Sequence, residues 1–202
     1  MKKLIIASLA LAMLFGCKKG ENDPGISFRS RDARVVGEWK MASFEMEAKS
    51  VNQMYNSSSV LVTTTNTRTS KYDGSRITRT VSTTGSSQTT TVDSSTYENT
   101  LTIEKDGTCV YTEKHTSSKE VNTYTSRGIW LWADSKKNKS SITLSFTDVS
   151  TPSSFTSGTY QIDLLKNKEM VLISNDSDND ATTSKTGSST ENTNTSKYTF
   201  KQ

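Results

Sequence analysis

The sequence predicts an all-β protein, an antiparallel up-and-down β-barrel of about eight to ten strands with long Thr/Ser-rich hairpins. Three observations lead to this prediction. Apolar side chains recur at every second position in several short segments, as expected for strands with one buried face. Glycine-containing turn sequences separate these segments. The chain has only two prolines, so most of it can pair as strands.

The composition is that of a folded but polar domain. Serine and threonine make up close to a third of the residues, and hydrophobic residues make up 31%. Threonine favours strands, and regularly spaced aliphatic and aromatic residues interrupt the polar stretches, which argues against disorder. The formal net charge of +4 is spread along the chain instead of forming a basic stripe. We therefore expect no nucleic-acid binding.

The chain opens with an export signal. A positive Lys2-Lys3 pair precedes the apolar run Leu4–Phe15, which is too short to span a bilayer but suits the core of a signal peptide. The run ends in Leu-Phe-Gly-Cys, which resembles a bacterial lipobox with cleavage before Cys17 and lipidation of its thiol. An ordinary secretory signal with an incidental cysteine is the alternative. Several acyl chains, at about 0.8 kcal/mol per buried methylene, would anchor the protein firmly.

Three parts follow from these signals. Residues 1–16 are predicted as a lipoprotein signal peptide, residues 17–33 as the lipidated cysteine and a flexible tether, and residues 34–202 as the barrel domain. No aspartate follows Cys17, and by resemblance to other lipoproteins this favours the outer membrane. We expect attachment to that membrane through the N-terminal lipid, with the leaflet left open.

The first predicted strand contains the sequence Gly-x-Trp. Side chains alternate faces along a strand. Four residues therefore share one face: Val35, Gly37, Trp39 and Met41. The tryptophan can close the floor of a barrel and bury about 150–250 Å². The next segment, residues 45–56, is compatible with a continued strand or with a short helix.

Further strands are predicted in order along the chain. They are residues 60–65, 76–81, 100–104, 108–113, 127–132, 141–146, 159–164, 170–173 and 197–201. Asp-Gly turns at Tyr72–Ser75 and Lys105–Gly107 favour hairpins. The Thr-rich segment near 56–98 has few apolar residues, so we expect an insertion whose hairpins project beyond the core. Residues 174–196 are expected to form a polar loop.

This order of motifs carries a resemblance. Gly-x-Trp, strand-Asp-Gly-strand, Gly-x-Trp-x-Trp and Tyr-x-Ile-x-x-Leu-x-x-x-x-Met-x-Leu follow one another over about residues 34–201. The arrangement is similar to that of lipocalin-like lipoproteins common in Bacteroidota. The chain departs from lipocalins at their second motif, where Thr147–Val149 stand, and no arginine follows Arg127. The resemblance implies a lipocalin-like barrel and leaves ligand transport open.

No pattern in the sequence predicts catalysis or metal binding. His115 is the only histidine, and no Gly-x-Ser-x-Gly sequence supplies a nucleophile. Asp176–Asp180 imitates the start of a calcium loop without the glycine and glutamate that complete one. Cys109 has no partner once Cys17 is acylated, and we expect it to be a small buried residue. We predict a protein that is not an enzyme and has no cofactor.

Two functions from different classes remain. One is an interaction or structural lipoprotein whose barrel is packed and whose Thr-rich hairpins contact an envelope protein or a glycan. The other is binding of a small apolar or amphipathic ligand in the barrel. The candidate residues lining such a barrel are Trp39, Met41, Leu101, Ile103, Tyr111, Trp130 and Trp132.

The two late tryptophans bear on this choice. Trp130 and Trp132 share one face of their strand, and Ile129 and Leu131 share the other. So polar a chain has few apolar side chains to spare for lining a cavity. We therefore favour the arrangement in which the two aliphatic side chains fill the core and the tryptophans face outward.

Cys17→Ala should abolish incorporation of labelled palmitate and release the protein from membranes, because the acylated thiol is the expected anchor. Metabolic labelling followed by membrane fractionation measures both effects. Palmitate labelling that is unchanged in the variant would contradict the lipoprotein assignment.

Overall fold

The computed structural model describes residues 29–84, 88–134, 138–148, 155–178 and 189–202. The predicted signal peptide, Cys17 and part of the Asp176–Asp180 segment lie outside these residues. The elements of the described chain are α2 Arg31–Val35, β1 Gly37–Tyr55, β2 Leu61–Tyr72, β3 Ile77–Thr83, β4 Thr89–Val92, β5 Thr96–Ile103, β6 Thr108–Thr116, β7 Val121–Trp132, β8 Ser141–Asp148, β9 Gly158–Leu165, β10 Glu169–Asp178 and β11 Ser189–Lys201.

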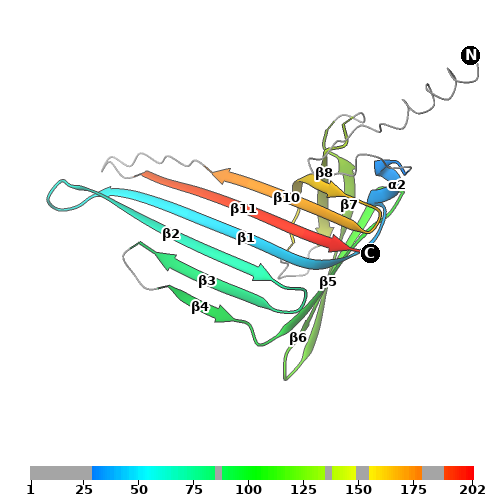
Figure 1. Ribbon diagram of the computed structural model, residues 1–202, viewed down its shortest axis with the longest axis horizontal. Helices are drawn as coiled ribbons and strands as arrows, with labels where there is room; N and C mark the ends of the chain where they lie inside the picture. Colours follow the sequence, from blue (N-terminus) through cyan, green and yellow to red (C-terminus); the bar gives the residue numbers. More distant parts are fainter. Residues whose placement is uncertain (1–28, 85–87, 135–137, 149–154, 179–188) are drawn as a thin grey trace, which may run out of the picture.

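Eight of the strands close into a barrel. Strands β5 to β11 follow one another as antiparallel neighbours, and β1 closes the ring by pairing with β5 on one side and β11 on the other. The short helix α2 lies at the end of the barrel where β1 begins (Figure 1). Closure leaves the barrel strands without free edges. The predicted antiparallel up-and-down barrel is confirmed.

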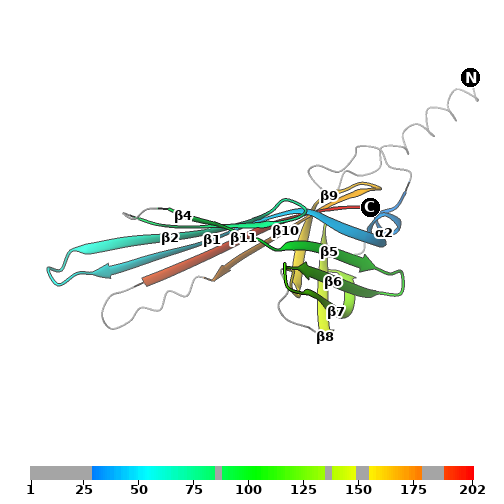
Figure 2. The ribbon, with the colours of Figure 1, turned by 90° about the horizontal axis from the view of Figure 1, so that it is seen from below.

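Strand β1 is too long for the barrel and continues into a second sheet. It pairs with β5 only over Gly37–Lys40, and over Phe44–Tyr55 it pairs with β2 instead. Strands β3 and β4 extend this sheet beyond β2, while β11 and β10 extend it on the opposite side of β1. We call this projecting sheet the wing. Seen nearly edge-on, the wing is a single layer that stands out from the barrel (Figure 2).

A β-bulge marks the point where β1 changes partner. The register against β11 slips at Ala42, so one extra residue stands in β1. Such a bulge bends the strand and shifts the alternation of its side chains, so that Trp39 before it and Phe44 after it are both buried. The β2–β3 turn packs here: Gly74 has a φ of 95°, and a Cβ on it would lie 2.9 Å from the Ala42 carbonyl oxygen. Only glycine satisfies both conditions.

The core begins at Trp39. Its side chain is fully buried, and its indole Nε1 donates a 2.8 Å hydrogen bond to the Val35 carbonyl oxygen in α2. The flanking Glu38 and Lys40 are exposed, as the predicted alternation requires. Val35 is buried with Trp39, although it ends α2 instead of lying in the strand. The first strand and its buried tryptophan are therefore as predicted.

Three segments differ from their sequence-based expectation or settle an open choice. Residues 45–55 continue β1 as a strand and do not form a helix. Residues 174–178 and 189–196, expected as part of a polar loop, extend β10 and β11 along β1. Residues 31–33, assigned to the flexible tether, belong to α2. The two strand extensions lack apolar residues. The β11 extension forms because the long β1 offers it a hydrogen-bonding edge, and the β10 extension pairs in turn with β11.

Trp39→Ala should lower the free energy of unfolding by about 3–5 kcal/mol, the usual cost of truncating a large core aromatic. Chemical denaturation of the two proteins measures the difference. Ile129→Ala is a suitable control, because Ile129 is 53% exposed and its truncation should change stability by less than about 0.5 kcal/mol. Equal losses in the two variants would mean that Trp39 does not organise the core.

Candidate functional site

The barrel interior is filled by side chains. Of the predicted lining residues, the following five are at most 1% exposed and belong to one hydrophobic core: Trp39, Met41, Leu101, Ile103 and Tyr111. Trp39 and Leu101 face each other across β1 and β5, and Leu101 faces Tyr111 across β5 and β6. These side chains pack against one another as core residues do.

Phe155 fills the barrel at the side where the wing leaves it. It lies in the connection between β8 and β9 and is 1% exposed. The centroid of its ring is 4.8 Å from that of Tyr160, 4.9 Å from that of Tyr198 and 5.3 Å from that of Tyr111. A fourth ring, Phe200, lies 5.7 Å away. Phe155 thus acts as a plug that occupies the space a ligand in the barrel would need.

The predicted orientation of residues 127–132, with the two aliphatic side chains in the core and the two tryptophans facing outward, is wrong. Ile129 and Leu131 are 53% and 49% exposed, while Trp130 and Trp132 are half-buried and pack against the core. The indoles face inward because each finds a hydrogen-bond acceptor on that side. The Nε1 atom of Trp130 donates to the carbonyl oxygen of Glu104 at 2.7 Å.

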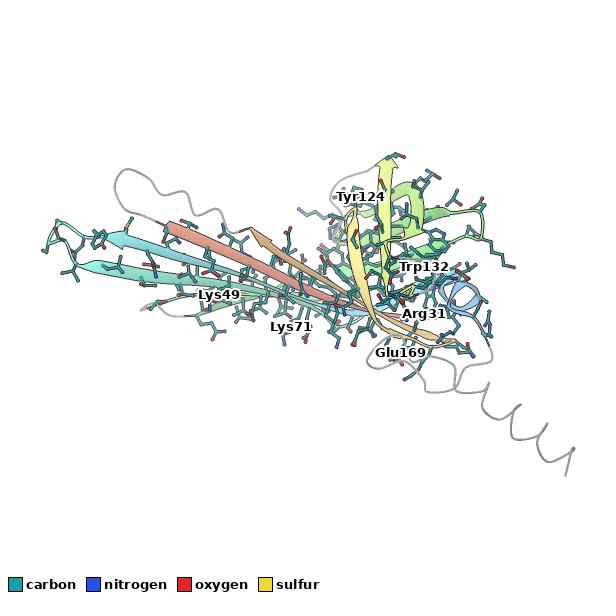
Figure 3. The ribbon with its side chains drawn as sticks, turned by 90° about the horizontal axis from the view of Figure 1, so that it is seen from above. Arg31, Lys49, Lys71, Tyr124, Trp132 and Glu169 are labelled. Carbon is teal, nitrogen blue, oxygen red and sulfur yellow. The ribbon has the colours of Figure 1, made fainter. Side chains whose placement is uncertain are left out.

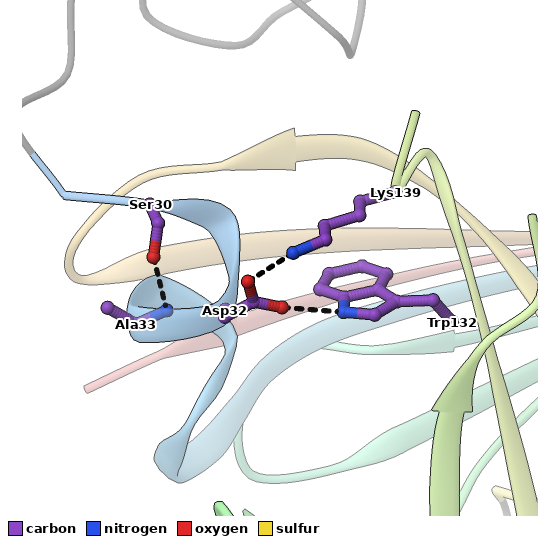
Figure 4. A network of polar contacts seen from close by, with 5 residues as sticks. All are labelled: Ser30, Asp32, Ala33, Trp132 and Lys139. Carbon is purple, nitrogen blue, oxygen red and sulfur yellow. Dashed lines mark hydrogen bonds and ion pairs between the residues drawn. The ribbon is translucent and has the colours of Figure 1, made fainter. Parts of the chain in front are cut away.

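Helix α2 supplies the acceptor for the other indole (Figure 4). Asp32 accepts a 2.8 Å hydrogen bond from Nε1 of Trp132 and forms an ion pair with Lys139. The Lys139 ammonium also lies 5.8 Å from the centroid of the Trp132 ring. Ser30 caps the helix by accepting a 3.2 Å hydrogen bond from the Ala33 amide. This network fixes the start of the described chain to the barrel.

A polar chain of contacts joins the wing to the barrel. Tyr72 on β2 donates a 2.9 Å hydrogen bond to the carbonyl oxygen of Tyr97, whose own hydroxyl donates to Asp93 at 2.7 Å. Asp93 forms an ion pair with Arg79 at 3.6 Å, and His115 stacks on Tyr97 with 4.8 Å between ring centroids. Burial and the bond to Asp93 raise the pKa of Tyr97 to about 12, so its phenol stays neutral. These contacts hold the base of the wing.

A hollow of about 570 Å³ lies where the wing meets the barrel. Its apolar wall includes Phe44, Met46 and Tyr160, and its polar wall includes Arg79 and Asp176. Burial raises the pKa of Tyr160, so the hollow carries a neutral phenol there. We call this space the inner hollow.

A second hollow, of about 470 Å³, lies farther out on the same face of the wing. It is centred on one cross-strand row, in which Ala48 is flanked by Arg68 on β2 and Asn194 on β11. Both hollows are lined by Asp176 and Asn194, so they form one groove along this face. We call this face the inner face, because it continues the surface that carries the buried Phe44.

The opposite, outer face of the wing is rich in threonine. Alternation places these threonines of β2, β3 and β11 there: Thr63, Thr65, Thr67, Thr69, Thr78, Thr80, Thr193 and Thr195. Lys49 and Lys71 stand among them on β1 and β2 (Figure 3). Beyond Phe44, no described residue of β1 is buried. Both faces of the outer wing are therefore open to contact.

The remaining chemistry-bearing residues serve the fold. Cys109 is 1% exposed and unpaired, and burial raises the pKa of its thiol to about 11. In the part of the chain that the structure describes, no three His, Cys, Asp or Glu residues are placed to hold a metal ion.

The described residues include no helix that is long and apolar enough to span a bilayer.

The sequence predicted the packed residues but missed the groove. Its polar residues, such as Asn194 and Asp176, fall in a segment expected to be a loop. The sequence also did not predict Phe155 as a core residue, because an isolated aromatic in a Ser/Thr-rich connection has no periodic pattern around it. Residues 189–196 contain no apolar side chain, so no alternation within them indicates that β11 extends this far.

Comparison with protein-family models, with curated proteins and with solved structures finds no match to this chain.

Phe155→Ala should open the barrel interior and lower the free energy of unfolding by about 3–5 kcal/mol. A small apolar molecule such as benzene should then raise the melting temperature of the variant, because it fills the new cavity, and leave the native protein unchanged. Tyr55→Ala, which truncates an exposed aromatic on the wing, is the control. Saturable changes in tryptophan emission when fatty acids, sterols or retinoids are added to the native protein would contradict the packed interior.

Proposed function

We propose that this protein is a lipid-anchored, non-catalytic lipoprotein of the outer membrane, in which the barrel is a packed support and the wing is the interaction surface. The packed interior carries this proposal. Five predicted lining residues are buried against one another, and Phe155 closes the space beside them. A barrel filled in this way has no room for an internal ligand.

The wing supports the proposal through its exposed area. Beyond its base the wing is a single layer that buries neither of its faces, whereas most sheets bury at least one. The polar side chains of the wing contribute little to a hydrophobic core, yet six strands of the chain take part in it. Such a surface suits recognition more than stability.

The groove on the inner face indicates the chemistry of the partner. Amide and hydroxyl groups line it, together with the charged residues Lys49, Arg68 and Asp176 in its outer part. An extended polar chain could exchange hydrogen bonds with these groups along the strands. We propose an envelope glycan as the partner that fits this lining, with an envelope protein as the alternative.

A second candidate function rests on the inner hollow. Its volume of about 570 Å³ falls within the usual range for small-molecule sites. Aromatic and aliphatic side chains on one wall and Arg79 on the other would suit an amphipathic molecule. Such a ligand would bind at the junction, outside the packed barrel.

Replacing Arg68 and Asn194 together by alanine should weaken glycan binding at least about tenfold, because one charged and one neutral hydrogen-bonding group are lost. Titration calorimetry with soluble peptidoglycan fragments and lipopolysaccharide-derived oligosaccharides measures the affinity.

The matched control replaces Lys71 and Thr195 by alanine, which removes one positive and one polar side chain from the outer face. Lys71 forms an ion pair with the exposed Glu45, at 3.2 Å, and a pair between two exposed side chains contributes little, so its loss should hardly affect stability. Equal weakening by both double variants would argue against the groove. Binding of an amphipathic compound that is lost in Arg79→Ala would favour the inner hollow instead.

A further inference from the structure

The end of the β1–β2 hairpin carries a cluster of exposed apolar side chains at the far end of the wing. The members and their exposed fractions are Met54 56%, Tyr55 56%, Val60 57%, Leu61 48% and Val62 40%. They stand out in a sheet made mostly of threonine, serine and asparagine. We call this cluster the wing tip.

The wing tip is apolar on both faces of the sheet. Met54 lies directly opposite Val62 on the inner face, and Tyr55 lies opposite Leu61 on the outer face. A groove on a protein usually covers one face of a strand pair, whereas a lipid bilayer surrounds an inserted element on all sides. The two-sided distribution therefore favours lipid.

Charge is absent from this end of the hairpin. No residue from Ser50 to Thr67 is charged, and Lys49 and Arg68 mark the ends of this uncharged stretch. On the neighbouring strand Glu191 lies opposite Val51. These charges are several residues behind the tip, at about 3.3 Å per residue. They would stay in water or among headgroups while the tip enters the apolar layer.

The turn that joins the two strands satisfies much of its own hydrogen bonding. The Asn56 side-chain oxygen accepts from the amides of Ser58 and Val60, at 2.9 and 3.0 Å. The Asn56 amide donates to the Val60 carbonyl oxygen, and the Ser59 amide donates to the Asn56 carbonyl oxygen, both at 2.9 Å. Backbone groups that are already paired lose little when they leave water. This lowers the cost of insertion.

From these observations we infer that the wing tip inserts into the apolar layer of a lipid bilayer. Exposed apolar patches mark interaction sites, and shallow insertion reaches about 5–10 Å into the boundary between headgroups and acyl chains. Strand β1 has 19 residues and spans about 60 Å, so the tip lies far from the α2 end. The proposed lipid anchor precedes α2. The protein would then hold a membrane at two separate points, although the tip needs no acylation of Cys17 to insert.

The test uses the full chain, expressed with its leader, purified from envelopes and reconstituted into vesicles of phosphatidylethanolamine and phosphatidylglycerol. Met54→Cys carries an environment-sensitive fluorophore, and Val92→Cys is the matched control, since both positions are 56% exposed on the wing. Cys109 is buried and should not react. Labelling of the parent chain reports any unacylated Cys17, so failure of the proposed anchor is detected separately.

Brominated lipid should quench the label at Met54 several-fold more than the label at Val92, and iodide in the water should do the reverse. Adding Leu61→Asp should remove the lipid quenching at Met54, while adding Val121→Asp, at an exposed barrel position, should not. Equal lipid quenching at both labelled positions, or iodide quenching alone, would overturn the inference. Protection of Met54 from both quenchers would also overturn it, because a protein would then cover the tip.

Discussion

The structure depends on a single strand that belongs to two sheets. The first residues of β1 close the barrel, and the rest of the strand forms the centre of the wing. Its partner changes from β5 to β2 between Lys40 and Phe44. The bulge at Ala42 makes this possible, because it bends the strand and restores the buried face after the bend. Gly74 lets the β2–β3 turn pack against the carbonyl oxygen of Ala42. Without this arrangement the wing would lack its connection to the core.

The two parts of the protein are stabilised by different forces. Burial of large side chains around Trp39 and Phe155 holds the barrel together, as the hydrophobic effect does in most domains. Most of the wing has no second layer to cover it and relies on strand pairing, with net gains of about 0.5–1.5 kcal/mol per hydrogen bond. Short contacts such as the 3.2 Å distance between the Thr80 and Thr90 hydroxyls add to this.

This division of the chain bears on function. A packed barrel can orient a surface without binding anything inside itself, and the α2 network holds the first described residues to one end of the barrel. The wing extends away from that end (Figure 1). It carries the groove, the threonine face and the wing tip. Recognition and attachment would thereby use separate parts of one sheet.

Local sequence determined the strands whose apolar residues alternate and the turns whose residues admit only one geometry. Trp39 and the Asp-Gly turn at Gly107 were predictable because alternation and positive φ are properties of a few neighbouring residues. Only the tertiary structure decided the direction of Trp130 and Trp132, since their hydrogen-bond acceptors come from distant segments. The same is true of the wing. Its polar strands pair outward from β1, through β2 on one side and β11 on the other, and no periodicity within those strands predicts this pairing.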